Sequence, residues 1–420
     1  MKQDWQVIVV GAGAAGLYAA ATAAAKGRRT LLLEKNRKLG VKILMSGGTR
    51  CNITHNTNWR GIANAFGKRQ GRFLKFALAT LPPETIVQRF HEWSVATKIE
   101  DTGKVFPVSN KAIDVRDALV KFARDSRAII ENETTVESIR KTADGFQIAT
   151  DGQEFRCESV IVTAGGQSYP GCGTTGDGYD WLRQLGHQVV APRPALTPLR
   201  VNQDWVRDLA GVTLPEVGLS IRLLRDTPTR KNAKASDRTQ YDGSFLFTHK
   251  GCSGPAVLNI SRVVTDPLNN CRKQLVCDWL PDRDEQQLRE SVLNHNATDS
   301  SRSVSAVLTG LIPKRLVETL CEISDVPVQR PLAELGKKQR SRLVTNIKQC
   351  PLEIDGTLGF AKAEVTAGGV DLSEVDPQTM ASRVCPGLFL AGEILDVDGP
   401  IGGYNFQAAF STGFVAGSNA

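Results

Sequence analysis

The sequence lacks the paired cysteines that structural zinc sites and thiol redox centres use. Its nine cysteines are scattered, with no CxxC pair and no repeated spacing between histidine and cysteine. This pattern supports neither a thioredoxin-like redox pair nor a metal site. Free thiols are typical of a reducing compartment, so we expect an intracellular protein with no bound metal.

The sequence also lacks the features that direct a chain to a membrane. Its opening, MKQDWQ, has an acidic residue near the front and not the basic-then-apolar order of a secretory signal. Residues 7–25 carry no charge, but three glycines interrupt the run, which indicates a buried strand, a tight turn and a buried helix. We therefore expect a cytoplasmic protein with no membrane partner.

Composition indicates the size class and a kind of partner. The chain has 420 residues, of which 41% are hydrophobic and 23% charged, as in a soluble globular protein of two or three domains. Its formal net charge is +8. A positive surface raises the local concentration of phosphate-rich partners, although the same excess can simply be spread over solvated faces.

A dinucleotide-binding pattern opens the chain. Residues 7–10 are a β-branched run, residues 11–16 have the form GxGxxG, and the alanine-rich stretch 17–25 favours a helix. An apolar strand at 30–33 then completes a βαβ unit. In this context the glycine pattern predicts a site for a dinucleotide cofactor, and a glycine-rich turn without a ligand is the less favoured alternative.

Each residue of this pattern has a physical role. Gly11 permits the tight turn, Gly13 lets the backbone approach a pyrophosphate, and Gly16 lets the helix pack closely on the strand. The helix N-terminus faces the phosphates. Glu34, at the end of the second strand, accepts a hydrogen bond from a ribose hydroxyl and disfavours a 2′-phosphate, so the cofactor is FAD or NAD rather than NADP.

Two further segments carry a resemblance to a known family. The first is Ser46-Gly47-Gly48-Thr49-Arg50-Cys51-Asn52-Ile53-Thr54, and the second is Gly368-Gly369-Val370 with the run 387–407. Over essentially its whole length the chain resembles the YhiN/BaiN/RdsA family of bacterial flavoproteins. One departure is Thr49, which stands where the family pattern has a glycine before the arginine.

The resemblance implies an α/β fold with FAD as the cofactor. The expected architecture is a Rossmann-type, glutathione-reductase-like FAD-binding domain made of residues 1–191 and 352–420. Several prolines and short strand-like runs after residue 191 predict a β-rich insert at 192–281. Charged stretches with apolar residues at helical spacing predict a small helical subdomain at 282–351.

The glycine pattern and the resemblance together predict the residues that bind FAD. In flavoproteins of this build, a glycine and an acid after a late strand meet the ribitol and pyrophosphate, and a helix N-terminus faces the flavin pyrimidine. The predicted set is Gly11, Gly13, Ala14, Ala15, Gly16, Glu34, Lys35, Lys42, Ser46, Gly47, Gly48, Arg50, Cys51, Asn52, Val136, Ala164, Gly165, Gly166, Gly392, Glu393, Gly402, Gly403, Tyr404 and Asn405.

Two residues are candidate catalytic proton donors. Cys51 follows Arg50, whose charge would lower the pKa of the thiol, although a small buried packing residue is an equally good interpretation. His249 ends a β-rich run and opens the turn Lys250-Gly251-Cys252-Ser253-Gly254-Pro255, where it could meet a substrate. A lone histidine is more often a structural hydrogen-bond donor.

The resemblance implies an enzyme that reduces a uridine to dihydrouridine in large-subunit (23S) ribosomal RNA, with NADH or NADPH as a possible reductant. Two basic clusters could follow an RNA backbone, or could be solvated faces. The first cluster is Lys68, Arg69, Arg72 and Lys75, and the second is Arg225, Arg230, Lys231, Lys234 and Arg238.

Two other functions remain open on the sequence. A flavin enzyme for a small molecule, such as an amine oxidase or an enone reductase, would need a closed apolar pocket and no RNA. A non-catalytic flavin-bound protein that binds RNA or senses redox state would show RNA affinity without turnover. The sequence identifies neither the target nucleotide, nor the reductant, nor the oligomeric state.

Overall fold

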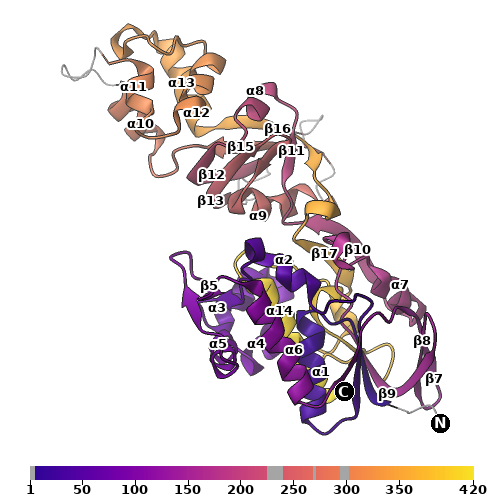
Figure 1. Cartoon of the computed structure of the whole chain (residues 1–420). Helices are drawn as coiled ribbons and strands as arrows, with labels where there is room; N and C mark the ends of the chain where they lie inside the picture. Colours follow the sequence, from indigo (N-terminus) through magenta and orange to yellow (C-terminus); the bar gives the residue numbers. More distant parts are fainter. Residues whose placement is uncertain (1–4, 225–239, 268–270, 294–301) are drawn as a thin grey trace. The chain divides into compact units, whose positions relative to one another are not determined.

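A computed structural model describes residues 5–224, 240–267, 271–293 and 302–420 of the chain. The chain divides into two compact units (Figure 1). The first unit joins the two ends of the chain, Met1–Pro194 and Ala363–Ala420, and the second unit is Ala195–Lys362. Each unit has its own apolar core.

A seven-stranded sheet forms the centre of the first unit. Its order is β6-β2-β1-β9-β8-β7, with β18 also paired to β9. The strands β6, β2, β1, β9 and β18 are parallel to their neighbours, and β7, β8 and β9 pair antiparallel. The bounds are β1 (Trp5–Val10), β2 (Thr30–Leu33), β6 (Ile129–Glu131), β7 (Val136–Thr142), β8 (Gly145–Thr150), β9 (Glu154–Val162) and β18 (Leu388–Leu390).

Buried apolar strands explain why the centre of this sheet is parallel. All four residues of β2 are buried, and so are Val160 to Val162 at the end of β9. Strands that are buried on both faces read as continuous apolar runs, as is usual in α/β folds. The predicted α/β class with a Rossmann-type domain is confirmed.

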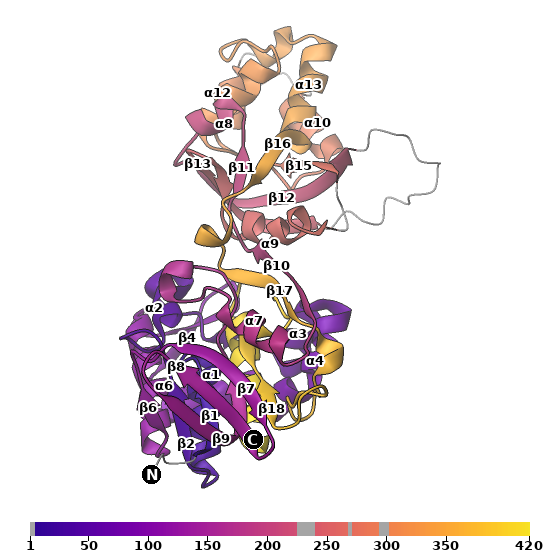
Figure 2. The ribbon, with the colours of Figure 1, turned by 90° about the vertical axis from the view of Figure 1, so that its right-hand side faces the viewer.

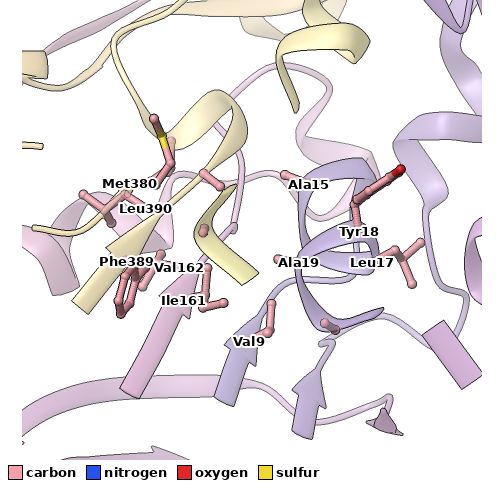
Figure 3. Packing of buried hydrophobic residues seen from close by; sticks show 14 of the residues in the cluster. Val9, Ala15, Leu17, Tyr18, Ala19, Ile161, Val162, Met380, Phe389 and Leu390 are labelled. Carbon is pink, nitrogen blue, oxygen red and sulfur yellow. The ribbon is translucent and has the colours of Figure 1, made fainter. Parts of the chain in front are cut away.

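The last helix of the chain packs on the first. Helix α1 (Ala14–Ala25) contacts α14 (Tyr404–Asn419) and α6 (Ala112–Asp125). Glycines allow the close approach: a Cβ at Gly413 would lie 2.4 Å from the Ala15 carbonyl oxygen, and one at Gly417 would lie 2.3 Å from that of Ala19. Figure 3 shows Ala15 and Ala19 on α1 beside the core residue Val9 of β1.

Shorter elements surround this core. The small antiparallel sheet β3-β5-β4 is separate from the central one. So is the two-stranded sheet β10-β17, which Figure 2 shows apart from the central strands. The helices are α2 (Val41–Thr49), α3 (Trp59–Ala65), α4 (Gly67–Thr80), α5 (Pro83–Glu92) and α7 (Asp177–Gln184), with short 3₁₀ turns η1 (Pro170–Cys172), η6 (Leu372–Glu374) and η7 (Gly392–Ile394). The strands are β3 (Thr54–His55), β4 (Thr97–Ile99), β5 (Lys104–Pro107), β10 (Val189–Ala195) and β17 (Val365–Val370).

The second unit is a closed barrel with helices. The barrel order is β11-β14-β13-β12-β15-β16, and β11 pairs with β16 to close it. The strands are β11 (Leu199–Val201), β12 (Thr213–Leu224), β13 (Gln240–Thr248), β14 (Gly251–Ser253), β15 (Arg272–Asp278) and β16 (Cys350–Thr357). The helices are α8 (Asp204–Asp208), α9 (Pro255–Val264), α10 (Glu285–Leu293), α11 (Val304–Leu308), α12 (Lys314–Ile323) and α13 (Lys337–Lys348), with η4 (Leu332–Glu334) and η5 (Phe360–Lys362).

This arrangement differs from the domain boundaries expected from the sequence. The β-rich part and the helical part share one apolar cluster, which includes Phe247 and Trp279 from the barrel side and Leu316 and Leu343 from the helices. They therefore form one compact unit rather than two. The chain returns to the first unit at Ala363 and not at residue 352, because β16 completes the barrel.

Among the described residues, no helix combines the length and the apolar character needed to span a bilayer.

The contact between α1 and α14 predicts a stability effect. Replacing Gly413 by Ala would force a methyl group against the Ala15 carbonyl, and overpacking of this kind costs about 1–3 kcal/mol. We expect a lower unfolding midpoint in thermal or urea unfolding. As a control, Gly152→Ala places its Cβ where no atom lies within 4 Å, and should change the midpoint little. Equal midpoints for the two variants would contradict the close approach of the helices.

Candidate active site

The glycine turn after β1 has the geometry of a phosphate-binding loop. Gly11 has a φ of 100°, and a Cβ there would lie 2.8 Å from the Thr163 carbonyl oxygen. A Cβ at Gly16 would lie 1.8 Å from the Gly11 oxygen, so this position must be glycine for α1 to pack on the turn. Gly13, at the N-cap of α1, faces open space, because a Cβ there would have no atom within 4 Å. That space fits a pyrophosphate at the helix N-terminus, beside Ala14 and Ala15.

The predicted ribose-binding acid is held by the turn itself. Glu34 is buried, and its Oε2 accepts a hydrogen bond of 2.7 Å from the Ala12 amide. Its Oε1 accepts from the backbone and side-chain nitrogens of Asn36, at 2.9 and 2.8 Å. These bonds fix the carboxylate at the end of β2, and its contact with a ribose hydroxyl stays a prediction.

Two further predicted cofactor contacts, Lys35 and Val136, follow β2 and begin β7. The ammonium of Lys35 bonds to Asp177 at 2.5 Å and to Thr175 at 2.7 Å, so it holds the start of α7. Val136 is the first residue of β7 and is buried. Their contact with a cofactor stays a prediction.

A polar cluster brings together predicted residues that are far apart in the chain. Lys42 Nζ lies 2.6 Å from Glu393 Oε2 and 2.5 Å from Ser168 Oγ. Glu393 Oε1 accepts from the Thr366 amide at 2.7 Å and from Ser168 Oγ at 3.0 Å. The amide of Gly392 donates to Thr412 Oγ1 at 3.0 Å. The cluster thus joins α2, the loop 164–168, β17 and α14 at one place.

The segment between α2 and β3 has a left-handed backbone. Gly47, Gly48 and Thr49 have φ values of 55°, 66° and 68°, and Cys51 has a φ of 59°. A non-glycine residue in this region costs about 1–2 kcal/mol. This conformation explains why a glycine suits the position of Thr49, and shows that the threonine adopts the same backbone here.

Cys51 corrects one expectation from the sequence. The thiol is fully buried, and burial raises its pKa to about 12, with a smaller opposing effect from a hydrogen bond to Ser46. Arg50 does not lower this pKa: its guanidinium lies 2.6 Å from Glu100 and 4.0 Å over the Phe106 ring. The expected lowering of the Cys51 pKa by Arg50 was wrong, and the enclosed surroundings favour the packing role that the sequence also allowed, whereas a catalytic role stays a prediction.

Asn52 and Asn405 hold the N-terminus of α14. The Asn52 amide, oriented so that both of its atoms find partners, accepts from the Gly403 amide at 2.9 Å and donates to the carbonyls of Thr54 and Val105. Asn405 Oδ1 accepts from the Gly399 amide at 2.8 Å, and its Nδ2 donates to the Gly399 carbonyl at 3.0 Å. Both side chains therefore position the turn at Gly402-Gly403, and a contact of this helix N-terminus with the flavin stays a prediction.

His55 is a residue of this site that the sequence patterns did not predict. Its ring stacks on Tyr404, with centroids 4.7 Å apart and an interplanar angle of 20°. Nδ1 lies 3.1 Å from the Gly402 carbonyl and so carries the proton that it donates. Burial lowers the pKa of His55, the Gly402 carbonyl opposes this, and the charge of Lys104 lowers it further. The signal in the sequence is its place directly after the segment 46–54.

Glu364 is a second residue that the patterns missed. It precedes β17, and its backbone carbonyl accepts from Ser168 Oγ at 3.3 Å, beside the Lys42–Glu393 pair. Among the described residues its carboxylate has no hydrogen bond or ion pair. Burial raises its pKa, and the charges of Lys42 and Lys104 oppose the shift. A half-buried acid of this kind is a candidate proton donor.

His249 lies in the second unit. It follows β13 directly and is exposed at the turn into β14. The first unit assembles its cluster without it, so a catalytic role for His249 stays a prediction.

The first basic cluster divides into two roles. Arg69 bonds to Asp396 at 2.8 Å and to Asp371 at 3.4 Å, so it ties α4 to the chain that leads into α14. Lys68, Arg72 and Lys75 are exposed, and their spacing places them on one face of the helix. The second predicted cluster, Arg225, Arg230, Lys231, Lys234 and Arg238, lies outside the described residues.

Comparison with known proteins gives consistent matches over nearly the whole chain. A family profile described as the HI0933-like protein Rossmann domain matches residues 5–419. A ribosomal RNA dihydrouridine synthase of Escherichia coli K12 is 32% identical over 413 residues, which is 98% of this chain and 96% of the relative. The protein of the same name from Haemophilus influenzae Rd is 31% identical, over 99% and 98% of the two chains. A 3-dehydro-bile acid delta(4,6)-reductase of Clostridium scindens is also 32% identical, over 98% of each chain.

The open space at Gly13 predicts a variant that folds but loses its cofactor. At Gly13 an added Cβ would have no atom within 4 Å and the backbone conformation is ordinary, so the fold of Gly13→Val should persist, whereas the side chain would fill the space for the pyrophosphate. We expect a folded, colourless protein by circular dichroism and visible absorbance, against a yellow parent that releases FAD on denaturation. The contrasting variant Gly16→Val should fail to fold stably. A yellow Gly13→Val protein would show that the phosphates bind elsewhere.

Proposed function

Because the chain belongs to the family of HI0933-like Rossmann proteins, and is an FAD-dependent oxidoreductase, we propose that it reduces a uridine to dihydrouridine in large-subunit (23S) ribosomal RNA. Relatives named for this activity are as similar to the chain as the bile acid reductase is. Similarity alone therefore does not choose between an RNA and a steroid-like substrate, and the choice depends on the surface of the chain.

The observation that favours RNA is the exposed basic face of α4. Arg69 and Gln70 of this helix bond to Asp396 and Asp398, which precede the turn at the N-terminus of α14. The other cations of the helix, Lys68, Arg72 and Lys75, are exposed and lie on one face of α4, which these bonds tie to the chain that leads into α14. A cationic face of this kind attracts a polyanion, whereas it contributes nothing to the binding of a small neutral substrate.

An exposed aromatic residue adds to this face. Phe76 follows Lys75 on α4 and is 43% exposed. A base of single-stranded RNA stacks on such a ring with about 1–3 kcal/mol of favourable free energy. The target uracil has to leave its own stack to react, at a cost of a few kcal/mol, which contacts of this kind offset.

The residues of the first unit divide the chemistry among them. The glycine turn after β1 and the Lys42–Glu393 pair would hold the pyrophosphate and ribitol of FAD, and the N-terminus of α14 would stabilise negative charge on its pyrimidine. When bound and reduced, FAD supplies the hydride that C6 of the uracil receives. The protein then has to deliver a proton to C5, and we propose Glu364 as the donor, because burial raises its pKa and so favours the protonated form. NADH or NADPH is the class of reductant that we propose.

The proposed RNA substrate predicts a salt-dependent reaction. With NADPH or NADH and unmodified 23S RNA, the FAD-loaded protein should form dihydrouridine, and affinity should fall steeply with salt, by a slope of about 0.7 for each single-stranded phosphate contact. Changing Lys68, Arg72 and Lys75 to Glu should weaken RNA binding and flatten this slope. The same charge change at Lys111, Lys121 and Arg124, which are exposed at or on α6, is the control.

Two outcomes would contradict the proposal. Turnover of an enone without any effect of RNA or salt would indicate the small-molecule reductase. RNA binding without dihydrouridine, under conditions where the flavin is reduced, would indicate a non-catalytic RNA-binding protein.

The proton donor predicts a pH dependence. Only the protonated form of Glu364 can donate, so turnover should fall as pH rises through its raised pKa, and Glu364→Gln should lose about 100-fold with the flavin spectrum unchanged. Cys51→Ala should keep its rate, because the thiol is enclosed. A full rate in Glu364→Gln together with a loss in His249→Ala would move the role to His249, and full rates in both would leave water as the donor.

A further inference from the structure

A polar groove lies between the end of α12 and one face of α13 in the second unit. Its volume is about 480 Å³. Six residues line it: Ile323, Lys338, Ser341, Arg342, Thr345 and Asn346. The groove contains none of the residues that the sequence patterns selected, so it is a separate feature of the surface.

The lining side chains have one chemistry in common. Five of the six can donate a hydrogen bond, and two of these, Lys338 and Arg342, are cations. Lys338 and Arg342 are four residues apart on α13, as are Ser341 and Thr345, so each pair lies along one side of the helix. The groove therefore presents a ladder of donors with positive charge.

The groups around the groove leave most of these donors available. Asp325 Oδ2 lies 3.5 Å from Arg342 Nη1, but both side chains are largely exposed, so this pair contributes little and can exchange. The Asn346 amide donates to Ser324 Oγ at 2.9 Å. Lys338 has no ion pair with a described residue. Another cation of α13, Arg340, points to the carbonyls of Leu332 and Leu335 and lines no part of the groove.

The charge of the second unit has the same sign as the groove. Its sequence holds 24 lysines and arginines against 19 aspartates and glutamates, so the unit carries most of the excess positive charge of the chain. A polyanion would therefore be drawn to this unit as a whole before it meets the groove.

We propose that the α12–α13 groove binds the sugar-phosphate backbone of the RNA substrate. Phosphates in protein–nucleic acid complexes are contacted by Lys and Arg together with Ser, Thr and Asn, which is the set found here. Ile323, 38% exposed, gives an apolar surface against which a ribose can lie. The groove carries no aromatic ring on which a base could stack, so it would hold the strand without reading its sequence. This inference rests on the proposed RNA substrate.

Two variants separate contact in the groove from general charge. Lys338→Ala with Arg342→Ala removes two phosphate contacts, so the affinity of the FAD-loaded, full-length protein for 23S RNA should fall roughly tenfold and the salt slope by about 1.4. Ser341→Ala with Thr345→Ala removes hydroxyl donors only, and should weaken binding with the slope unchanged. Arg289→Ala with Lys314→Ala, which removes cations of α10 and α12 outside the groove, is the control for net charge. Binding is measured by fluorescence anisotropy over a salt series, with thermal unfolding as a check on the fold.

The outcomes distinguish this inference from the proposed function. Suppose that the parent binds RNA with a steep salt slope and that the Lys338/Arg342 variant has the same RNA affinity and slope as the Arg289/Lys314 control. The proposal that the groove binds RNA is then overturned, and the proposed function stands. If the hydroxyl variant binds as tightly as the parent, the groove is no specific contact and the inference fails. If the parent itself shows no salt-dependent RNA binding, the proposed function fails first, and this inference fails with it.

Discussion

The close packing of α14 on α1 is the constraint on which the candidate active site depends. The two helices come from opposite ends of the chain, and they meet because Gly413 and Gly417 leave room for the backbone of α1. The same approach places Gly392 against Ala15 and brings the N-terminus of α14 to the unit that carries the glycine turn. Without this contact, the phosphate end and the flavin end of the predicted site would not share one fold.

Around that contact, hydrogen bonds and an ion pair link many of the side chains of the candidate active site to one another and to the backbone. Glu34 and Asn52 make bonds to the glycine turn and to Gly403, and the Lys42–Glu393 pair links α2 to the strand β17 through Thr366. Such bonds fix the backbone before any ligand arrives, which lowers the entropy cost of binding. Glu364, whose pKa is raised, and His55, whose pKa is lowered, lie next to this network.

The sequence predicted the parts of this protein that local patterns determine. Residues 7–34 show their βαβ unit through glycine spacing and apolar runs, and the predicted FAD-binding residues from residue 392 onwards lie where the chain returns to the first unit. Contacts between residues that are far apart in the chain could not be predicted from local patterns. The barrel closes only when β16 pairs with β11, a contact between distant parts of the chain. Local composition therefore could not show that the chain re-enters the first unit at Ala363. The burial of Cys51 reverses the effect expected from Arg50, and His55 gains its place only through Tyr404, far along the chain.

The central claim is that this chain reduces a uridine in ribosomal RNA, and mapping dihydrouridine in the 23S RNA of its own cell tests it most directly. The comparison is between cells with the gene, cells without it, and cells that carry the gene again. We expect that one 23S position loses dihydrouridine on deletion and regains it on complementation. An identical dihydrouridine map in all three strains would contradict it.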